Sequence, residues 1–221
     1  SASDIIVEPR RRAFKAIGDS SAIAQNTSYT GLGSSDFSIS FWTNNFKPDN
    51  SNGGYIRFNR ADGEYLYYFG FNNGTSNDSR VLVRTGSLGT AGQAVYNTSF
   101  TTEWVQVVIT FDVGSLNTAP NLFINNSPIA STGYSHGGGA AGTITQIDMN
   151  LDDEYGLQDL VIWNKVLGAA EISELYNFGD WLSPDSHSAN GNIVDWYMMG
   201  EEDYWYDLGY RFNDVLSDIG G

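Results

Sequence analysis

The chain has 221 residues, with 26 acidic and 11 basic side chains and therefore a net charge of −15, and it contains no cysteine. These values argue against binding of nucleic acid through its phosphates, and they exclude disulfides and thiolate metal sites. No apolar run is long enough to span a membrane, so we expect no membrane insertion, and the length suits one domain better than two.

The first basic cluster lies near the start of the chain. It contains four of the eleven basic residues, Arg10, Arg11, Arg12 and Lys15. The apolar residues around them indicate a strand. Two interpretations stay open. The charges can keep a solvated strand edge from pairing with itself, or they can dock onto an acidic neighbour. The three arginines are therefore candidates for subunit docking.

The next segments alternate as β-strands do. Residues 36–42 place three apolar side chains on one face, those of Phe37, Ile39 and Phe41. Aromatic-rich runs at 55–60 and 65–71 flank an Asp-Gly pair, which predicts a hairpin. The small polar residues of 72–79 predict a loop.

The second half continues this pattern. Residues 104–112 predict a strand with one apolar face, formed by Val105, Val107, Ile109 and Phe111. A hairpin is expected at 121–129, with its turn at Asn125 and Asn126 because Asn tolerates left-handed backbone. A glycine-rich loop is expected at 133–142.

A strand that runs into a short amphipathic helix is predicted for 156–176. Ile172, Leu175 and Tyr176 have the spacing of one helix face. Gly179 can end the helix in left-handed backbone.

The early "FSISFW" strand and the late "GLQDLVIWNKVLGAAEISELY" segment together resemble laminin-G-like domains of the concanavalin A-like superfamily. The resemblance implies an all-β fold, a two-sheet antiparallel jelly-roll sandwich with one short helix. It covers about residues 13–200 of a single domain at 1–221. Residues 201–221 form an acidic, aromatic tail that matches nothing in the family.

Residues 174–200 resemble a variant of this domain found in tailed-phage and marine viral proteins. The matches include Glu174, Tyr176, Asn177, Gly179, His187, Ser188 and Trp196. This resemblance implies a structural protein of a virion. For His187 the simpler role is a capped turn before the last core strand.

An acidic cluster surrounds the start of the predicted late strand. Oxygen-rich loops of this kind bind Ca²⁺, and the resemblance implies a calcium ion at the rim of the sandwich. The candidate ligands are Asp148, Asp152, Asp153 and Asp159. A solvated acidic loop without metal is the alternative.

Aromatic rings outside the expected core strands are candidates for sugar contacts, because the faces of pyranose rings are apolar. We expect carbohydrate binding at Tyr96, Tyr134 and Tyr155, with burial in the core as the alternative. In the tail, Tyr204, Trp205 and Tyr206 are candidates for subunit docking.

No catalytic motif stands in a suitable context. Gly133-Tyr-Ser-His-Gly137 matches the G-x-S-x-G motif of serine hydrolases. In those enzymes the motif forms a nucleophile elbow, which requires a strand-to-helix turn of an α/β sheet. The acid-bearing strand of laminarinase-type glycosidases is missing, and two histidines supply few proton relays or zinc ligands. We therefore expect no enzyme.

The expected function is a non-enzymatic virion module, for capsid decoration or association with a bacteriophage tail or fibre. It would contact other virion proteins or further copies of itself, and it would bind glycans through loops at 72–79, 133–142 and 148–156. The alternative is a secreted, extracellular carbohydrate-binding module of a bacterium, or a domain related to polysaccharide hydrolases or lyases.

Overall fold

The structure, a computed structural model, describes thirteen stretches of the chain, and in some strands it describes the backbone alone. These stretches are residues 14–15, 22–26, 32, 36–44, 55–60, 65–71, 80–85, 92–98, 104–112, 118–135, 143–151, 156–180 and 182–197.

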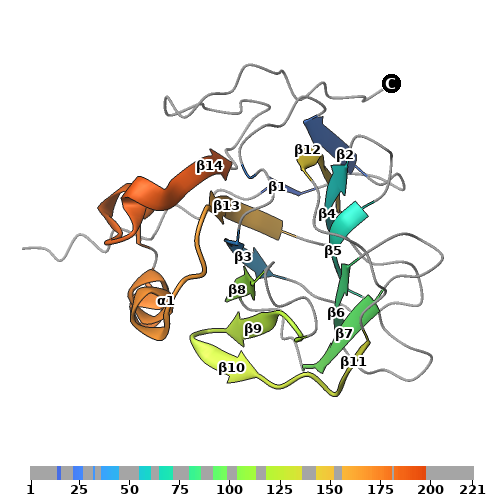
Figure 1. The fold of residues 1–221 in the computed structure, drawn as a ribbon. Helices are drawn as coiled ribbons and strands as arrows, with labels where there is room; N and C mark the ends of the chain where they lie inside the picture. Colours follow the sequence, from blue (N-terminus) through green and yellow to red (C-terminus); the bar gives the residue numbers. More distant parts are fainter. Residues whose placement is uncertain are drawn as a thin grey trace, which may run out of the picture.

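Seven described strands form sheet A, in the order β1-β13-β3-β8-β9-β10, with β14 also paired to β13. Every pair in this sheet is antiparallel. The strands are β1 (Phe14–Lys15), β3 (Phe37–Asn44), β8 (Val105–Phe111), β9 (Asn121–Ile124), β10 (Ser127–Ile129), β13 (Gly156–Trp163) and β14 (Ile193–Tyr197). Figure 1 shows β3, β8 and β13 side by side in this sheet.

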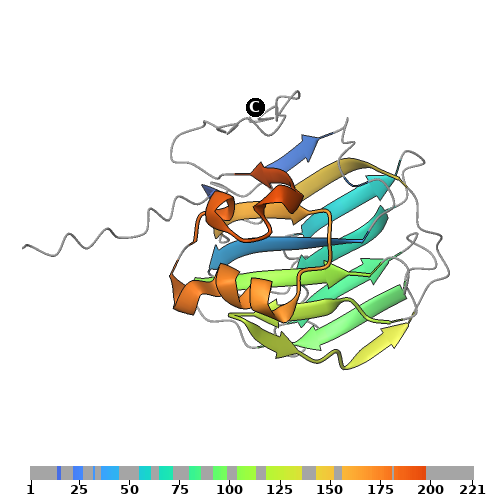
Figure 2. The same ribbon diagram turned by 60° about the vertical axis from the view of Figure 1, so that its left-hand side comes forward.

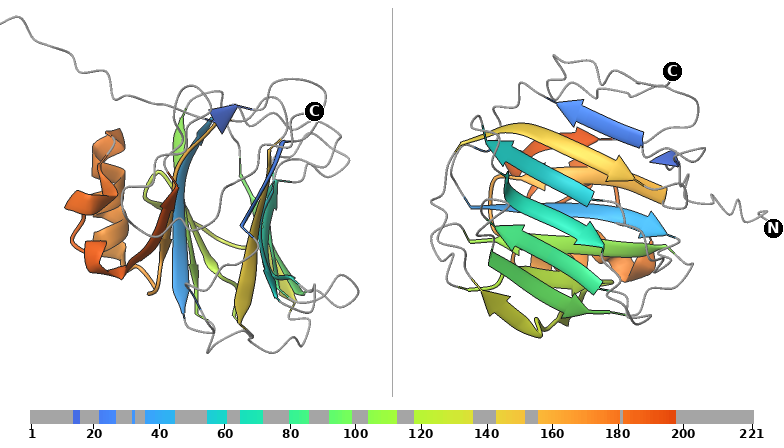
Figure 3. Two further views of the ribbon diagram at one scale, coloured as in Figure 1. Left: turned by 90° about the horizontal axis from the view of Figure 1, so that it is seen from above. Right: turned by 90° about the vertical axis from the view of Figure 1, so that its right-hand side faces the viewer.

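Seven further strands form sheet B, in the order β11-β7-β6-β5-β4-β12-β2, again with antiparallel pairs. They are β2 (Ala22–Asn26), β4 (Tyr55–Arg60), β5 (Tyr65–Phe71), β6 (Arg80–Thr85), β7 (Gly92–Asn97), β11 (Gly133–Ser135) and β12 (Ile144–Leu151). The two sheets lie face to face (Figure 3). An antiparallel β-sandwich of the expected class is therefore confirmed.

The main core fills the space between the sheets. Val105, Val107, Ile109 and Phe111 all belong to it, which confirms the predicted apolar face of β8. The rings of Phe37 and Phe111 stack with their centroids 4.5 Å apart. The other face of β8 is buried as well, because a helical segment covers it.

This segment, residues 164–192, is called the helical cap. It contains α1 (Ala169–Tyr176) and the three short 3-10 turns η2 (Asn177–Gly179), η3 (Pro184–Ser186) and η4 (Asn190–Asn192). A second apolar cluster lies between the cap and sheet A, and it includes Val108, Val161, Trp163, Ile172 and Leu175. The molecule therefore has three layers, with the cap, sheet A and sheet B in that order (Figures 2 and 3).

The turn expected at Asn125 and Asn126 is confirmed, since their φ angles are 49° and 62° and β9 pairs with β10. The neighbouring antiparallel strands β4 and β5 also confirm the pair expected around the Asp-Gly segment.

Three boundaries differ from the prediction. Gly133–Ser135 is strand β11 rather than loop, because it pairs with β7. Strand β12 continues to Leu151 and β13 begins at Gly156, so the acidic loop is shorter than 148–156. Helix α1 ends at Tyr176, since Asn177 with φ 42° caps it before Gly179. Residues 72–79, 136–142 and 152–155 lie outside the described residues.

No helix in the described part of the chain has the length and apolar character needed to cross a membrane.

Candidate functional site

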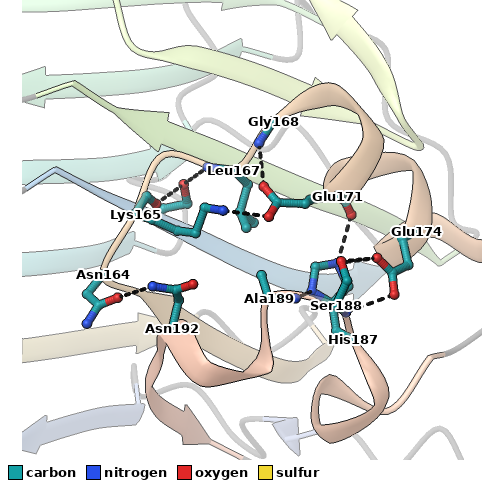
Figure 4. Close-up of polar contacts among 11 residues, drawn as sticks. Asn164, Lys165, Leu167, Gly168, Glu171, Glu174, His187, Ser188, Ala189 and Asn192 are labelled. Atoms are coloured by element: carbon teal, nitrogen blue, oxygen red, sulfur yellow. Dashed lines mark hydrogen bonds and ion pairs between the residues drawn. The ribbon is translucent and has the colours of Figure 1, made fainter.

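A polar network joins residues within the helical cap (Figure 4). Glu171 lies in the first turn of α1, and its carboxylate accepts hydrogen bonds from the Lys165 Nζ at 2.5 Å and from the Gly168 N–H at 2.8 Å. These two bonds, chiefly the one from Lys165, lower the pKa of Glu171 below its usual range. The carboxylate thus fixes the start of the helix, as a capping box does.

His187 is buried under α1 and has two backbone partners. Its Nδ1 accepts a hydrogen bond from the Ala189 N–H at 3.0 Å, so the proton of the neutral ring lies on Nε2, which donates to the Glu171 carbonyl oxygen at 2.9 Å. The ring also packs against Trp163, with the centroids 5.0 Å apart. His187 therefore closes a turn before β14, as its simpler interpretation predicted.

Glu174 ties the end of α1 to the same turn. Its carboxylate accepts hydrogen bonds from the Ser188 N–H at 2.9 Å and from the Ser188 hydroxyl. The hydroxyl bond is the largest cause of the lowered pKa of Glu174. Residues that match the viral-type pattern therefore meet in the cap, where their described contacts are structural.

Asp159 is buried beneath the cap, at a bulge in the pairing of β13 with β3. Its Oδ1 accepts a hydrogen bond from the Trp196 Nε1 at 2.9 Å, and its φ of 50° is left-handed. Asp159 lines a small cavity with Leu175, which belongs to α1. Its carboxylate thus lies on the cap side of sheet A.

The expectation that Asp159 ligates calcium together with Asp148 is therefore wrong. Asp148 belongs to β12 in sheet B, whereas the Asp159 carboxylate is turned toward the cap and is bonded to Trp196. Asp152 and Asp153 lie outside the described residues. Where side chains are described, no group of three or more His, Asp or Glu residues could hold a metal ion.

Gln106 connects the middle of sheet A to α1. Its Nε2 donates to the Leu175 carbonyl oxygen at 2.8 Å, and its buried Oε1 has no hydrogen-bond partner among the described residues. The cavity that it lines with Asp159 has a volume of about 10 Å³. This is room for about one water molecule and not for a sugar.

Of the three aromatic candidates for sugar binding, the structure contradicts Tyr96 and leaves Tyr134 and Tyr155 as predictions. Tyr96 is 1% exposed, and its hydroxyl donates to the Pro120 carbonyl oxygen, so its ring is part of the core and offers no platform. Tyr134 is half-buried and packs against the same core. Burial and the neighbouring Tyr134 phenol raise the pKa of Tyr96. Tyr155 lies outside the described residues.

The candidates for subunit docking, Arg10, Arg11, Arg12, Tyr204, Trp205 and Tyr206, also lie outside the described residues, so their docking role stays a prediction.

The outer face of sheet B is the face turned away from sheet A, and no described element lies over it (Figure 3). Ile56 and Phe58 belong to the main core, so Arg57 between them lies on the outer face. Residues directly opposite in an antiparallel pair share a face. The register therefore extends one row from Arg57 across all seven strands, through the positions of Gln25, Asp148, Arg57, Tyr68, Arg84, Gln93 and Ser135.

This row is polar throughout, and the charge of its sheet is unusual for the chain. The strands of sheet B contain Arg57, Arg60, Arg80 and Arg84 but one carboxylic acid, Asp148. The chain as a whole has 26 acidic and 11 basic residues. The strands of sheet B thus carry a net positive charge within an acidic protein.

This row was not predicted from the sequence. Alternation along β4 and β6 places Arg57 on the face opposite to Ile56, and Arg84 on the face opposite to Val83, but the alignment of the six strand pairs depends on register. Register follows from loop lengths and turn geometry that the sequence pattern does not give.

No protein-family model and no curated protein matches the chain. Among solved structures, it is similar to a native heptameric SAP-like pentraxin from Limulus polyphemus, with 10% identity, a TM-score of 0.54, and coverage of 75% of this chain and 82% of that one. The T. cruzi calreticulin globular domain is 12% identical, with a TM-score of 0.52 and coverage of 75% and 76%.

The binding domain of botulinum neurotoxin DC in complex with SialylT is 16% identical, with a TM-score of 0.50. There the match covers 66% of this chain and 36% of the other. These structures are jelly-roll sandwiches of lectin type, so the likeness confirms the fold that the laminin-G resemblance implied.

Proposed function

We propose that this chain is a non-catalytic recognition domain that binds acidic glycans through the outer face of sheet B. The observation that carries the proposal is the contrast between the two sheets. The helical cap covers the outer face of sheet A, whereas no described element covers the arginine-bearing outer face of sheet B.

Positive charge at this face favours carboxylated or sulfated sugars, because Arg forms paired hydrogen bonds with planar anions. Asp148 occupies the position directly opposite Arg57 in the register, so an acid is the cross-strand neighbour of that arginine. Arg84 stands opposite Tyr68 and Gln93, which carry no charge at neutral pH. Arg84 is therefore the position on which we expect anion recognition to depend most.

A binding role suits this face better than hydrolysis. Glycosidases that use acid catalysis need two carboxyl groups on opposite sides of the scissile bond. The strands of sheet B supply one acid, Asp148. The similar neurotoxin structure was solved with SialylT, which is compatible with a ligand-binding use of this fold.

Calorimetric titration with defined acidic and neutral oligosaccharides tests the proposal. Oligoguluronate and chondroitin sulfate fragments represent the acidic class, and laminari-oligosaccharides represent the neutral class. We expect binding of an acidic ligand that weakens with added salt, because exposed charge pairs are screened. Arg84→Ala weakens that binding by about tenfold or more, since one such pair contributes about 1.5 to 3 kcal/mol.

Lys165→Met is the matched control, because it removes the same charge from the helical cap on the other side of sheet A. It leaves the affinity unchanged. Equal affinity for the neutral and acidic ligands, or equal effects of both substitutions, contradicts the proposal. Turnover of either ligand contradicts the non-catalytic role.

The resemblance of residues 174–200 to viral proteins supports a second part of the proposal, a location on a virion surface with other virion proteins as partners. The extracellular bacterial module remains the alternative. Sequencing the DNA that flanks the gene distinguishes them, because capsid, portal or tail genes accompany the first and polysaccharide-utilisation genes the second.

Calcium stays part of the proposal at Asp148, Asp152 and Asp153, without Asp159. A rise in Tm with Ca²⁺ but not with Mg²⁺ would support it. Loss of the rise in Asp152→Asn, with no loss in Asp159→Asn, would locate the ion.

A further inference from the structure

Phe178 is the least expected side chain on the described surface. It lies in η2, two residues after the end of α1, is 99% exposed and has φ 59° and ψ 22°. A bulky residue rarely adopts left-handed backbone, since its Cβ crowds the neighbouring carbonyl. Both the solvent exposure and the backbone conformation of Phe178 are therefore unfavourable in the isolated chain.

The cap geometry holds the phenyl ring in this position. Asn177, Phe178 and Gly179 have φ angles of 42°, 59° and 94° in succession. The Asn177 N–H donates to the Ser173 carbonyl oxygen, and the Asp180 N–H donates to the Asn177 carbonyl oxygen at 3.1 Å. Strain of this kind is often found at binding surfaces.

The helical cap, which bears this ring, is acidic. The helical cap contains Glu171, Glu174, Asp180 and Asp185 against one basic side chain, Lys165. Asp180 lies two residues after Phe178 and is exposed, as is Asp185. Among the described residues, the other exposed large apolar side chain, Val166, also belongs to the cap. A cationic partner therefore suits this surface better than an anionic glycan or an anionic membrane.

We propose that Phe178 and the cap carboxylates receive the Arg10–Arg12 segment of a second copy of this chain. Arg10–Arg12 is a run of three consecutive cations in a chain of net charge −15. A guanidinium can stack on an aromatic ring while its N–H groups bond to nearby carboxylates. The arginines and the cap carboxylates thus have complementary charges, and the contact would cover the Phe178 ring, which is otherwise exposed to water.

The contact joins two different surfaces, one from each copy. Head-to-tail contacts of this kind generate rings when the rotation closes and filaments when it does not. The proposal does not depend on glycan binding, because the cap and the outer face of sheet B lie on opposite sides of sheet A.

Sedimentation velocity of the full chain over a concentration series is the test. Phe178→Gly removes the ring, and glycine adopts φ 59° without strain. The triple variant Arg10→Glu, Arg11→Glu, Arg12→Glu reverses the charge of the segment that is proposed to dock. We expect the parent chain to self-associate and each variant to weaken association by about tenfold or more. Circular dichroism and Tm verify that both variants fold.

Mixing the two variants is the decisive step. The triple-Glu copy retains Phe178 and the Phe178→Gly copy retains the arginines, so a one-to-one mixture forms a dimer while neither variant does so alone. Failure of the mixture to dimerise, or a monomeric parent chain at every concentration, overturns the proposal. Association of Phe178→Gly that equals the parent also overturns it. Binding of laminari-oligosaccharides at Phe178 by a monomeric parent would assign the ring to a glycan instead.

Discussion

Asp159 and Trp196 lie 37 residues apart in the sequence, yet the Asp159 Oδ1 accepts a hydrogen bond from the Trp196 Nε1 at 2.9 Å in the buried layer beneath the helical cap. This bond joins the bulge of β13 to β14 and fixes the edge of sheet A on which the cap rests. An acid that the sequence offered as a calcium ligand thus has a structural role.

Replacing Asp159 tests that role. Asp159→Ala removes the acceptor for Trp196 and places alanine at φ 50°, so the free energy of unfolding falls by about 2 to 3 kcal/mol. Asp159→Asn keeps an oxygen acceptor and tolerates this backbone, so it costs about 1 kcal/mol or less. Chemical denaturation measures both values. Equal losses would show that the hydrogen bond contributes little.

Glu174 and Ser188 form a second long-range connection within the cap. Glu174→Gln and Ser188→Ala each lower the stability by about 0.5 to 1 kcal/mol, since the carboxylate is 35% exposed and its bonds are partly screened. The double variant loses less than the sum, because both changes remove the same bonds. Strict additivity in the double-mutant cycle would contradict the contact.

The lowered pKa values of Glu171 and Glu174 predict how stability depends on pH. A carboxyl group whose pKa is lower in the folded state binds protons more weakly there than in the unfolded chain. Its stabilising contribution is present above the unfolded value of about 4.3 and is lost as pH falls through the folded value.

Acidification below that range should therefore reduce the free energy of unfolding, and the slope should be smaller in the Glu171→Gln, Glu174→Gln variant. Denaturation curves collected across this pH range measure both slopes. An unchanged slope in the double variant would show that other acids account for the loss.

Tyr96→Phe separates core packing from ligand binding. The substitution keeps the ring and removes the hydroxyl that donates to Pro120, so we expect a loss of about 1 kcal/mol in stability. Affinity for an acidic glycan should stay unchanged, because the ring lies in the core between the sheets. Weaker glycan binding at full stability would restore Tyr96 as a contact residue.

Phe178→Gly should raise the free energy of unfolding by about 0.5 to 1 kcal/mol, because glycine adopts φ 59° without the strain that phenylalanine bears. Phe178→Ala is the matched control, since it removes the ring and keeps the strain. Thermal denaturation under monomeric conditions compares them. A loss of stability in the glycine variant would show that the ring makes a stabilising contact within the chain.

The sequence predicted the strands whose alternation is long. In β3 and β8 the residues expected on one face do form the main core, because period-two burial leaves a direct pattern in the sequence. The late strand and helix were also predicted, although the bulge at Asp159 was not. Nothing in the local pattern marks the left-handed backbone of that aspartate, which depends on Trp196 and the cap.

The candidate site was less accessible to prediction. Burial of Tyr96 follows from its place on β7 beside Ala94, but six residues are too few to distinguish a core strand from a loop. The row through Arg57 and Arg84 joins residues from seven strands that become neighbours through register alone. Single-strand periodicity contains no information on that alignment.

The most direct test of glycan binding at sheet B is chemical-shift mapping of the isotope-labelled protein during titration with an acidic oligosaccharide. We expect shifts concentrated in β4, β5 and β6, at Arg57, Tyr68 and Arg84, with the amides of Glu171 and His187 in the cap unmoved. Shifts centred on the cap, with sheet B unaffected at saturation, would contradict it.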